Sequence, residues 1–482
     1  MGSVTAPAGR QHSAYLTGSA MPPSGVDKLL RRVGDRLMRH QRAIRAVQWG
    51  VVAAYVVLIS VPTFLPLPDR TAHIWSNLTL FAQFVFWGIW WPFVLLSMIL
   101  VGRMWCGLLC PEGALSEVAS SHGLGRAVPS WITWQGWPFV AFAGTTIYGQ
   151  MVSVYQYPKP VLIILGGSTL AAIVVGYLYG RSKRVWCRYL CPVSGVFGLL
   201  SKLAPVYFSI DRSAWQAWHK PRGAHITPVN CAPLVPLRTM RGSSTCHMCG
   251  RCSGFRGAIS LARRSPNHEI VHVSGDVTRP AETVLIIFGM LGLAAGAFHW
   301  TSSGVFVDVK QTLAEWFVDH GAVWMLEPLA PWWILTNYPE QNDALTLLDG
   351  VVLIGYILAS TLIIGGTVAG CLAAAVRIWG RWSLARWHHL AQALIPIAGC
   401  GVFLGLSSLT VTMLRAEGLA LDFVGAIRAM LLASAGVWSL ALGWQIAGLY
   451  IKASGIRIVS MLPIAVAVGV GCASWASLFW SF

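Results

Sequence analysis

Long apolar segments dominate this chain and limit the folds that it can adopt. They occur nine times, and each approaches the roughly 20 apolar residues that a helix needs to cross the hydrocarbon core of a bilayer. At that length, a helix satisfies every backbone polar group without water. The sequence therefore predicts an all-α polytopic membrane protein with about nine transmembrane helices. The segments lie near residues 47–66, 78–101, 134–152, 160–180, 282–299, 349–376, 390–411, 423–450 and 458–480.

The basic residues of the chain are distributed unevenly between the loops. The net charge is +17, and 30 of the 35 Lys and Arg residues fall on one side if the first span enters from the cytoplasm. This bias predicts a multi-pass protein of the cytoplasmic (inner) membrane, with a cytoplasmic N-terminus and an extracytoplasmic C-terminus. The charge then serves orientation and contact with membrane lipid or an acidic partner, and nucleic acid is not expected.

Two short motifs nearly repeat each other at the ends of the second and fourth spans. Residues 105–111 and 186–192 both read W-C-x-x-L-C-P. Spacing of i and i+4 predicts that both thiols of a pair lie on one helix face, with the proline as a helix stop or the first residue of a new helix. Two soft sulfurs suit copper, and four from both repeats suit another ion or a cluster. The candidate metal ligands are Cys106, Cys110, Cys187 and Cys191.

A third cysteine motif lies in the large hydrophilic region. Cys246, Cys249 and Cys252 form C-x-x-C-x-x-C, a ferredoxin-type spacing that wraps a 4Fe-4S cluster. Arg256 stands where such motifs usually have a fourth cysteine, so Cys231 is the preferred fourth ligand, with Cys191 or Cys110 as alternatives. A structural zinc site is the competing interpretation. His247 is expected to be a solvated loop residue.

The spans and motifs divide the chain into six parts. Between the arm and the C-terminal spans, two tandem repeats of helices lead to a cofactor-binding region and then to a further span. The parts are a basic cytoplasmic arm (1–46), four helices in two repeats (47–192), a cytoplasmic ferredoxin-like 4Fe-4S region (193–281), a fifth span (282–299), an extracytoplasmic acidic, Trp-rich loop (300–348) and four C-terminal spans (349–482).

The cysteine motifs resemble those of membrane-bound polyferredoxins of the NapH/NosR type, which are related to ferredoxins of cytochrome oxidase copper assembly. The resemblance rests on W-C-G-L-L-C-P-E-G-A-L at 105–115, W-C-R-Y-L-C-P at 186–192 and the C-x-x-C-x-x-C motif at 246–252, and it covers roughly residues 47–300. It implies 4Fe-4S ligation by Cys246, Cys249 and Cys252, and electron transfer from quinone or a cytoplasmic donor. One incomplete ferredoxin motif stands where family members commonly have two complete ones.

These observations predict a 4Fe-4S ferredoxin-type protein in electron transfer to, or maturation of, an extracytoplasmic reductase. One cluster is expected, with a second as an option, and the chain is expected to be an accessory subunit rather than a stand-alone enzyme. Its partners would be a redox protein or the quinone pool. His73 and His299 are candidates for a quinol site, although ordinary interfacial positions are the preferred interpretation of both. The alternatives are a copper-handling assembly factor that uses the C-x-x-x-C-P thiols, and a permease with a structural zinc loop.

Overall fold

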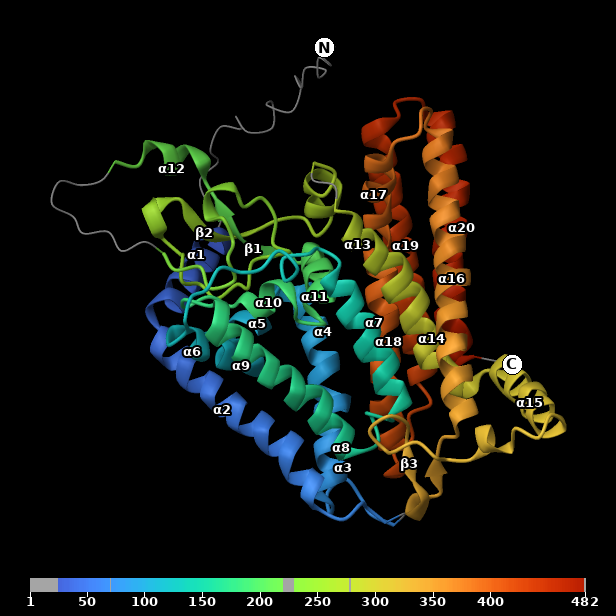
Figure 1. Ribbon diagram of the computed structural model, residues 1–482. Helices are drawn as coiled ribbons and strands as arrows, with labels where there is room; N and C mark the ends of the chain where they lie inside the picture. The colour runs from blue at the N-terminus through green and yellow to red at the C-terminus, as the bar shows by residue number, and fades with distance from the viewer. Residues whose placement is uncertain (1–24, 70, 220–228, 277–278, 481–482) are drawn as a thin grey trace.

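The structure, a computed structural model, describes residues 25–69, 71–219, 229–276 and 279–480, and most of these are helical (Figure 1). Within these ranges, eight helical segments are long and apolar enough to cross a membrane. The all-α polytopic membrane fold is therefore confirmed. The segments are Gln41–Phe64, Leu78–Val101, Pro158–Tyr179, Pro280–Ser302, Leu347–Ile378, Leu384–Ala416, Val424–Tyr450 and Ser454–Phe479.

The predicted span near 134–152 is shorter than the other eight. It forms α7 (Trp137–Met151), and 15 residues at 1.5 Å per residue give a helix of about 22 Å. That is less than the roughly 30 Å of a hydrocarbon core. Figure 1 nevertheless shows α7 running from the end of the molecule near α11 (Ser194–Leu200) toward the end near α8 (Pro158–Val161).

The second helix of each predicted repeat is built in three pieces. A π-helical turn separates two α-helical pieces in both copies, and such turns are frequent at functional sites. The first copy consists of α3 (Leu78–Gln83), the turn Phe84–Trp90 and α4 (Trp91–Val101), and the second of α8, the turn Leu162–Gly166 and α9 (Gly167–Tyr179). The first helix of the first repeat is α2 (Gln41–Ser60), extended by a short turn at Val61–Phe64.

Short helices follow each of these second helices at the same end of the molecule (Figure 1). After α4 come α5 (Met104–Leu108) and α6 (Pro111–Ser121), and after α9 come α10 (Val185–Tyr189) and α11. The two C-x-x-x-C-P motifs lie on these connections, so the fold brings both copies to one end of the bundle.

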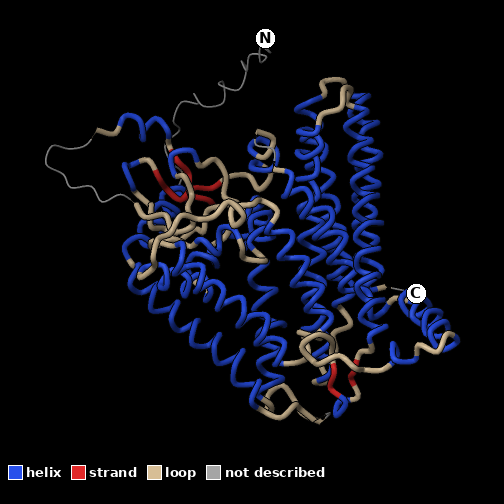
Figure 2. Tube along the Cα trace, in the orientation of Figure 1, coloured by secondary structure: helices blue, strands red, loops and turns tan. Residues whose placement is uncertain are grey.

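A small β-structure stands beside the motif helices (Figure 2). Strand β1 (Val206–Ile210) pairs in antiparallel register with β2 (Ile259–Arg263), placing Val206 opposite Arg263 and Ile210 opposite Ile259. Phe208 and Leu261 form a small apolar core with Met248 and Cys252. Helix α1 (Gly25–Arg39) packs on this core through Leu30 and Val33, while α12 (Arg212–Ala217) follows β1. The predicted basic arm is therefore part of this region, although its residues 1–24 lie outside the described ones.

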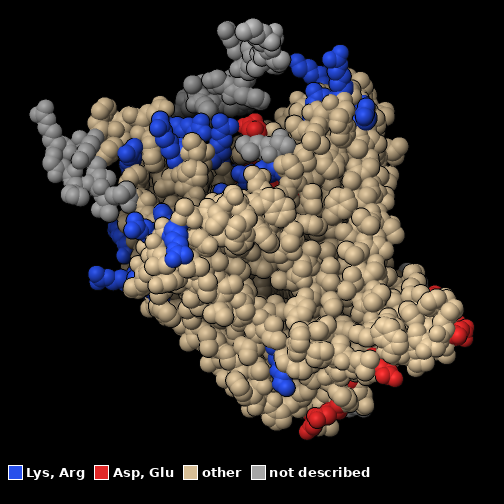
Figure 3. Space-filling model, viewed as in Figure 1, with Lys and Arg blue, Asp and Glu red and all other residues tan. Residues whose placement is uncertain are grey.

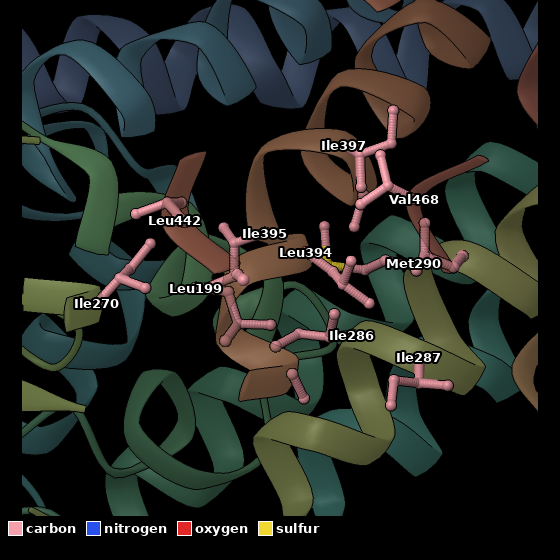
Figure 4. Close-up of a cluster of buried hydrophobic side chains, with 14 of the residues drawn as sticks. Leu199, Ile270, Ile286, Ile287, Met290, Leu394, Ile395, Ile397, Leu442 and Val468 are labelled. Carbon is pink, nitrogen blue, oxygen red and sulfur yellow. The ribbon is translucent and has the colours of Figure 1, made fainter. Parts of the chain in front are cut away.

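The C-terminal helices form the largest apolar core, and this core extends to the helix after the second motif (Figure 4). The fifth span comprises α13 (Pro280–Val284), a π-helical turn at Leu285–Leu293 and α14 (Ala294–His299). Leu199 of α11 packs with Ile286 and Met290 of this span and with Leu394. The C-terminal helices are α16 (Leu347–Ile378), α17 (Leu384–Ala391), α18 (Ile395–Ala416), α19 (Val424–Tyr450) and α20 (Ser454–Phe479).

The predicted Trp-rich loop forms a separate surface layer at the opposite end of the molecule from the cysteine motifs (Figure 1). It contains α15 (Gly304–Asp319) and the short antiparallel strands β3 (Asn337–Tyr338) and β4 (Asp343–Ala344). Trp316, Trp324 and Trp333 are all exposed. On the face shown in Figure 3, Lys and Arg gather mostly at the cysteine end, and Asp and Glu mostly at the loop end.

Candidate iron-sulfur centre

The first motif turns sharply between its two cysteines. Cys106 lies in α5, which ends at Leu108, whereas Cys110 is the residue that caps the N-terminus of α6. Its Sγ accepts a hydrogen bond from the Gly113 amide at 3.4 Å, and Pro111 opens the new helix as expected. The prediction that both thiols lie on one helix face is wrong, because the helix breaks before the second cysteine.

The second motif repeats this geometry. Cys187 lies in α10, which ends at Tyr189, and Cys191 follows in a turn before α11. The Ser194 hydroxyl donates to the Cys187 carbonyl at 2.9 Å, which ties this turn to the preceding helix. In each motif, the first thiol therefore comes from a one-turn helix and the second from the bend that follows.

The four thiols of the two motifs interact with one another. Burial raises the pKa of Cys110 well above its ordinary range, and the neighbouring Cys187 and Cys106 raise it further. Burial raises the pKa of Cys187 to about 12, with a further contribution from Cys106. The pKa of Cys191 is raised in the same way, by burial and then by Glu112 and Cys187. Thiols 81 residues apart in sequence thus form one group, which we call set one (Cys106, Cys110, Cys187, Cys191).

The loop cysteines form a second group, set two (Cys231, Cys246, Cys249, Cys252). Burial raises the pKa of Cys246 to about 12, and Cys249 and Cys231 contribute to the shift. The pKa of Cys252 is raised by burial and by the other three members of the set. Cys231 therefore lies with the C-x-x-C-x-x-C loop, whereas Cys110 and Cys191, the alternative fourth ligands, lie with set one.

Helix α1 holds the set-two loop in place. Gly250 adopts a φ of +76°, and a side-chain carbon added there would lie 2.5 Å from Cβ of Leu37 in α1. The Ser253 hydroxyl donates to an Asp35 carboxylate oxygen of α1 at 2.9 Å, and the amide of Gln41, the first residue of α2, donates to the Cys249 carbonyl at 3.0 Å. Both the left-handed backbone and the lack of space explain why glycine occupies position 250.

Two buried arginines connect the two thiol sets. Arg103 donates to the Ser244 carbonyl at 3.0 Å near set two and to the Ser194 hydroxyl at 3.1 Å near set one. Arg184 is only 2% exposed and donates to the Cys106 carbonyl at 2.5 Å. These guanidinium groups supply positive charge where thiolates would otherwise repel each other, which favours an anionic thiolate cluster.

Glu117 links Arg184 to the set-two loop. Its carboxylate accepts from Arg184 Nε at 2.8 Å and from Arg251 Nη1 at 2.6 Å. Burial alone would raise the pKa of Glu117, but Arg184 and Arg251 together hold it below its ordinary value. A charged carboxylate between two guanidinium groups therefore joins α6 to both the second motif and the loop.

The thiols of set one line a cavity of about 220 Å³. One end of its wall carries the four thiols, Arg103 and Glu112, and the Trp186 indole donates to the Glu112 carboxylate at 3.2 Å. Burial raises the pKa of Glu112. The rest of the wall is mostly apolar and largely aromatic, with Thr145, Thr146 and Ser168 as its polar exceptions, and the two π-helical turns contribute to it. This part includes Phe86, Trp87, Trp90, Trp91, Tyr155, Ile164, Leu165, Phe298, Val402 and Leu406.

The residues present fit iron-sulfur clusters. Each set supplies four sulfurs, the number of ligands that a cubane cluster takes, and backbone N–H groups donate to Sγ of Cys110 and Cys246 as they do around such clusters. Among the described residues, no three or more His, Cys, Asp or Glu side chains are arranged to hold a single metal ion. A single tetrahedral zinc ion needs sulfurs within about 3.8 Å of one another, given a Zn–S bond of roughly 2.3 Å. A cubane separates its thiolates further, because four irons and four sulfides lie between them.

Glu112 and Glu117 belong to the site, although the cysteine spacing gave no reason to single them out. Glu112 directly follows Pro111 at the start of α6, and Glu117 lies five residues further along the same helix. Their signal in the sequence was weak, because two carboxylates beside a membrane-face motif are equally typical of solvent-exposed positions. Their roles depend on Trp186, Arg184 and Arg251, which come from distant parts of the chain.

Three histidines were singled out in the sequence, and one of them differs from the prediction. His247 was expected to be solvated, and this is wrong, because its side chain is only 2% exposed. His73 and His299 do not line the cavity; their ring nitrogens contact Glu417 and Tyr356, respectively.

Comparison with known proteins defines the class of this site. Two segments of the chain, residues 83–129 and 162–209, match the family model of the 4Fe-4S binding domain. Each segment contains one C-x-x-x-C-P motif and much of the span before it, and residues 246–252 lie outside both. The matches support a 4Fe-4S ferredoxin-type family and an iron-sulfur cluster, as the sequence predicted. The chain thus combines two segments similar to the 4Fe-4S binding domain with a polytopic membrane fold.

One curated protein is similar to part of this chain. The chain is similar to "Putative electron transport protein YccM" of Escherichia coli (strain K12), with 27% identity over 241 residues. The similarity covers 44% of this chain and 65% of the relative, just under two thirds of the relative's length. No solved structure matches the chain significantly.

Proposed function

We propose that this protein is a two-cluster electron relay at one face of the membrane. Set one would hold one 4Fe-4S cluster and set two the other. The observation that carries the proposal is the division of eight cysteines into two groups of four, each interacting within itself. Arg103 and Arg184 lie between the two thiol sets, and Arg184 interacts with cysteines of both. Their shared positive charge supports electron exchange between the two clusters.

The second reaction partner of the relay would be a membrane-soluble quinone. Both thiol sets lie at the same end of the bundle, so clusters alone do not bridge a hydrocarbon core of about 30 Å. The cavity beside set one offers an aromatic wall within the membrane-spanning helices, with Glu112 and Arg103 at its polar end. A ring with two oxygens and an isoprenoid tail matches such a wall, since ligand sites combine apolar surface with a few polar groups.

The destination of the electrons follows from the same arrangement. Electrons exchanged with quinone become available to enzymes on the opposite side of the membrane, including an extracytoplasmic reductase. The orientation proposed for this role places the cysteine end in the cytoplasm, as the gathering of Lys and Arg at that end supports. Maturation of such a reductase would use the same electron path.

Iron analysis of cysteine variants tests the two-cluster assignment. Anaerobically purified protein should contain about eight iron atoms per chain and two electron paramagnetic resonance signals after reduction. Cys191→Ser and Cys246→Ser should each remove one signal and about half of the iron. Cys371→Ser, in α16 and outside both sets, is the matched control and should change neither. Four irons or fewer in the parent protein, or loss of the same signal in both variants, would refute two separate sites.

Cavity-filling variants test the quinone assignment. A reduced short-chain quinone analogue is mixed anaerobically with the oxidised protein, and the reduction of the clusters is followed optically. Leu406→Trp should slow this reduction at least tenfold because Leu406 lines the cavity. Leu362→Trp adds the same bulk at an exposed position of α16 and should leave the rate unchanged. Equal rates in the parent protein and in Leu406→Trp would contradict a quinone in this cavity.

A further inference from the structure

His247 is buried within the set-two loop and has an unpaired ring nitrogen. Its side chain is 2% exposed, and Nδ1 has no hydrogen-bond partner among the described residues. A buried polar group without a partner costs about 1–3 kcal/mol, so native structures rarely retain one. The position of this imidazole, between Cys246 and the rest of the loop, therefore calls for a partner at the site itself.

The charged neighbours of His247 cannot accept a hydrogen bond from it. These neighbours are Arg103, Arg184 and Arg188. An imidazole carries at least one N–H donor in either protonation state, whereas a guanidinium group has donors only and no acceptor. The three arginines thus leave the imidazole N–H in need of an acceptor of another kind.

His247 also lies where the two thiol sets meet. A side-chain carbon added at Gly107 in α5 would come within 2.0 Å of the His247 carbonyl oxygen and 2.9 Å of the Cys249 amide. Arg103 and Arg184 are charged neighbours of both His247 and Cys187 of set one. The nearby Cys106 and Ser244 carbonyls already accept from these arginines, whereas the sulfurs of the two sets remain as further acceptors.

We propose that the imidazole of His247 donates its N–H to a cluster sulfur at the junction of the two sets and thereby raises the reduction potential of that cluster. This proposal rests on the proposed function. A hydrogen bond to a cluster sulfur stabilises the reduced form, which carries one more negative charge than the oxidised form. His247 is a positioning and tuning residue in this role, and it transfers neither the electron nor a proton.

Redox titration of loaded protein tests this role. His247→Leu removes the donor, and at a fixed applied potential its ratio of reduced to oxidised cluster should fall about tenfold, which is about 59 mV for a one-electron couple. His247→Gln keeps an N–H donor and should restore part of the ratio. His272→Leu, at an exposed position of the same region, should match the parent protein. The cluster signal that shifts identifies which set receives the bond.

A second measurement covers the case in which His247→Leu loses its clusters. Protein with ¹⁵N-labelled histidine is reduced, and electron-nuclear double resonance is recorded in H2O and D2O. The proposal expects a nitrogen coupling and an exchangeable proton coupling to one cluster. Their absence from loaded parent protein, or identical potentials in the parent and His247→Leu, would overturn the proposal. A parent protein without two cluster signals would instead overturn the proposed function, so the two failures are distinguishable.

Discussion

Gly107 provides the sharpest test of the contact between the two thiol sets. It lies between Cys106 and Leu108 in α5, and its carbonyl accepts from the Gln48 side chain at 3.0 Å. In Gly107→Ala, the new Cβ would stand 2.0 Å from the His247 carbonyl oxygen. An ordinary contact begins at 3.4 Å, so α5 and the loop must separate by about 1.4 Å.

The cost of that separation can be estimated from its surroundings. Both clashing groups are backbone, so no side chain can rotate away, and overpacking of this kind costs about 1–3 kcal/mol or more. Ligand geometry at a functional site tolerates about 0.5 Å. A shift of about 1.4 Å therefore exceeds the tolerance of the loop, and Gly107→Ala should lose the set-two cluster or weaken its magnetic interaction with the set-one cluster.

The assay combines iron content, electron paramagnetic resonance and thermal denaturation of the anaerobically purified protein. Gly50→Ala in α2 is the matched control, because a side-chain carbon there meets nothing within 4 Å, and alanine favours the helix. The control should retain both signals and melt at or above the temperature of the parent protein. If Gly107→Ala also keeps both clusters, their interaction and the melting temperature, the proposed contact between α5 and the loop is refuted.

The other predictions concern buried ions and a single thiol. Glu117→Gln should lower the free energy of unfolding by about 3 kcal/mol, because Arg184 stays buried without its carboxylate. Folding lowers the pKa of Glu117, so the difference in stability between the parent protein and Glu117→Gln should be complete above pH 4.5, the ordinary pKa. The difference should vanish as the pH falls through the pKa of Glu117 in the folded protein. Thermal melts from about pH 3 to 7 at constant salt check this, and a difference independent of pH would contradict it. Cys231→Ser should abolish the same cluster signal as Cys246→Ser and spare the other; loss of the set-one signal would refute its assignment. Lys202→Met should lower the free energy of unfolding by about 3 kcal/mol, measured by chemical denaturation, because it leaves Glu282 without its buried partner. Lys202 is 4% exposed and donates to Glu282 at 2.5 Å and to Gln392 at 2.8 Å, where the loop region meets the C-terminal helices. The control Lys452→Met changes an exposed loop residue and should leave the denaturation midpoint unchanged.

The apolar segments, the charge bias and the three cysteine motifs were readable along the sequence because each depends on local composition or spacing. Eight of the nine predicted spans meet the length of a membrane helix, and the iron-sulfur family is supported by residues 83–129 and 162–209. The prediction that Cys106 and Cys110 lie on one face of a single helix was wrong, and the reason is also local. Pro111 favours a new helix, and the break falls before the second cysteine rather than after it.

Only the tertiary structure grouped the thiols. Hydrophobicity sets which segments enter the membrane, but it does not specify which helix ends meet, so the association of Cys106 and Cys110 with Cys187 and Cys191 follows from packing of the two repeats. The same packing buries His247, pairs Glu117 with Arg184, and lays α1 over the set-two loop. Sequence determined the segments and the ligand types; the contacts between distant segments decided how many sites those ligands form, because thiolates separated by 81 residues interact only when the chain folds them together.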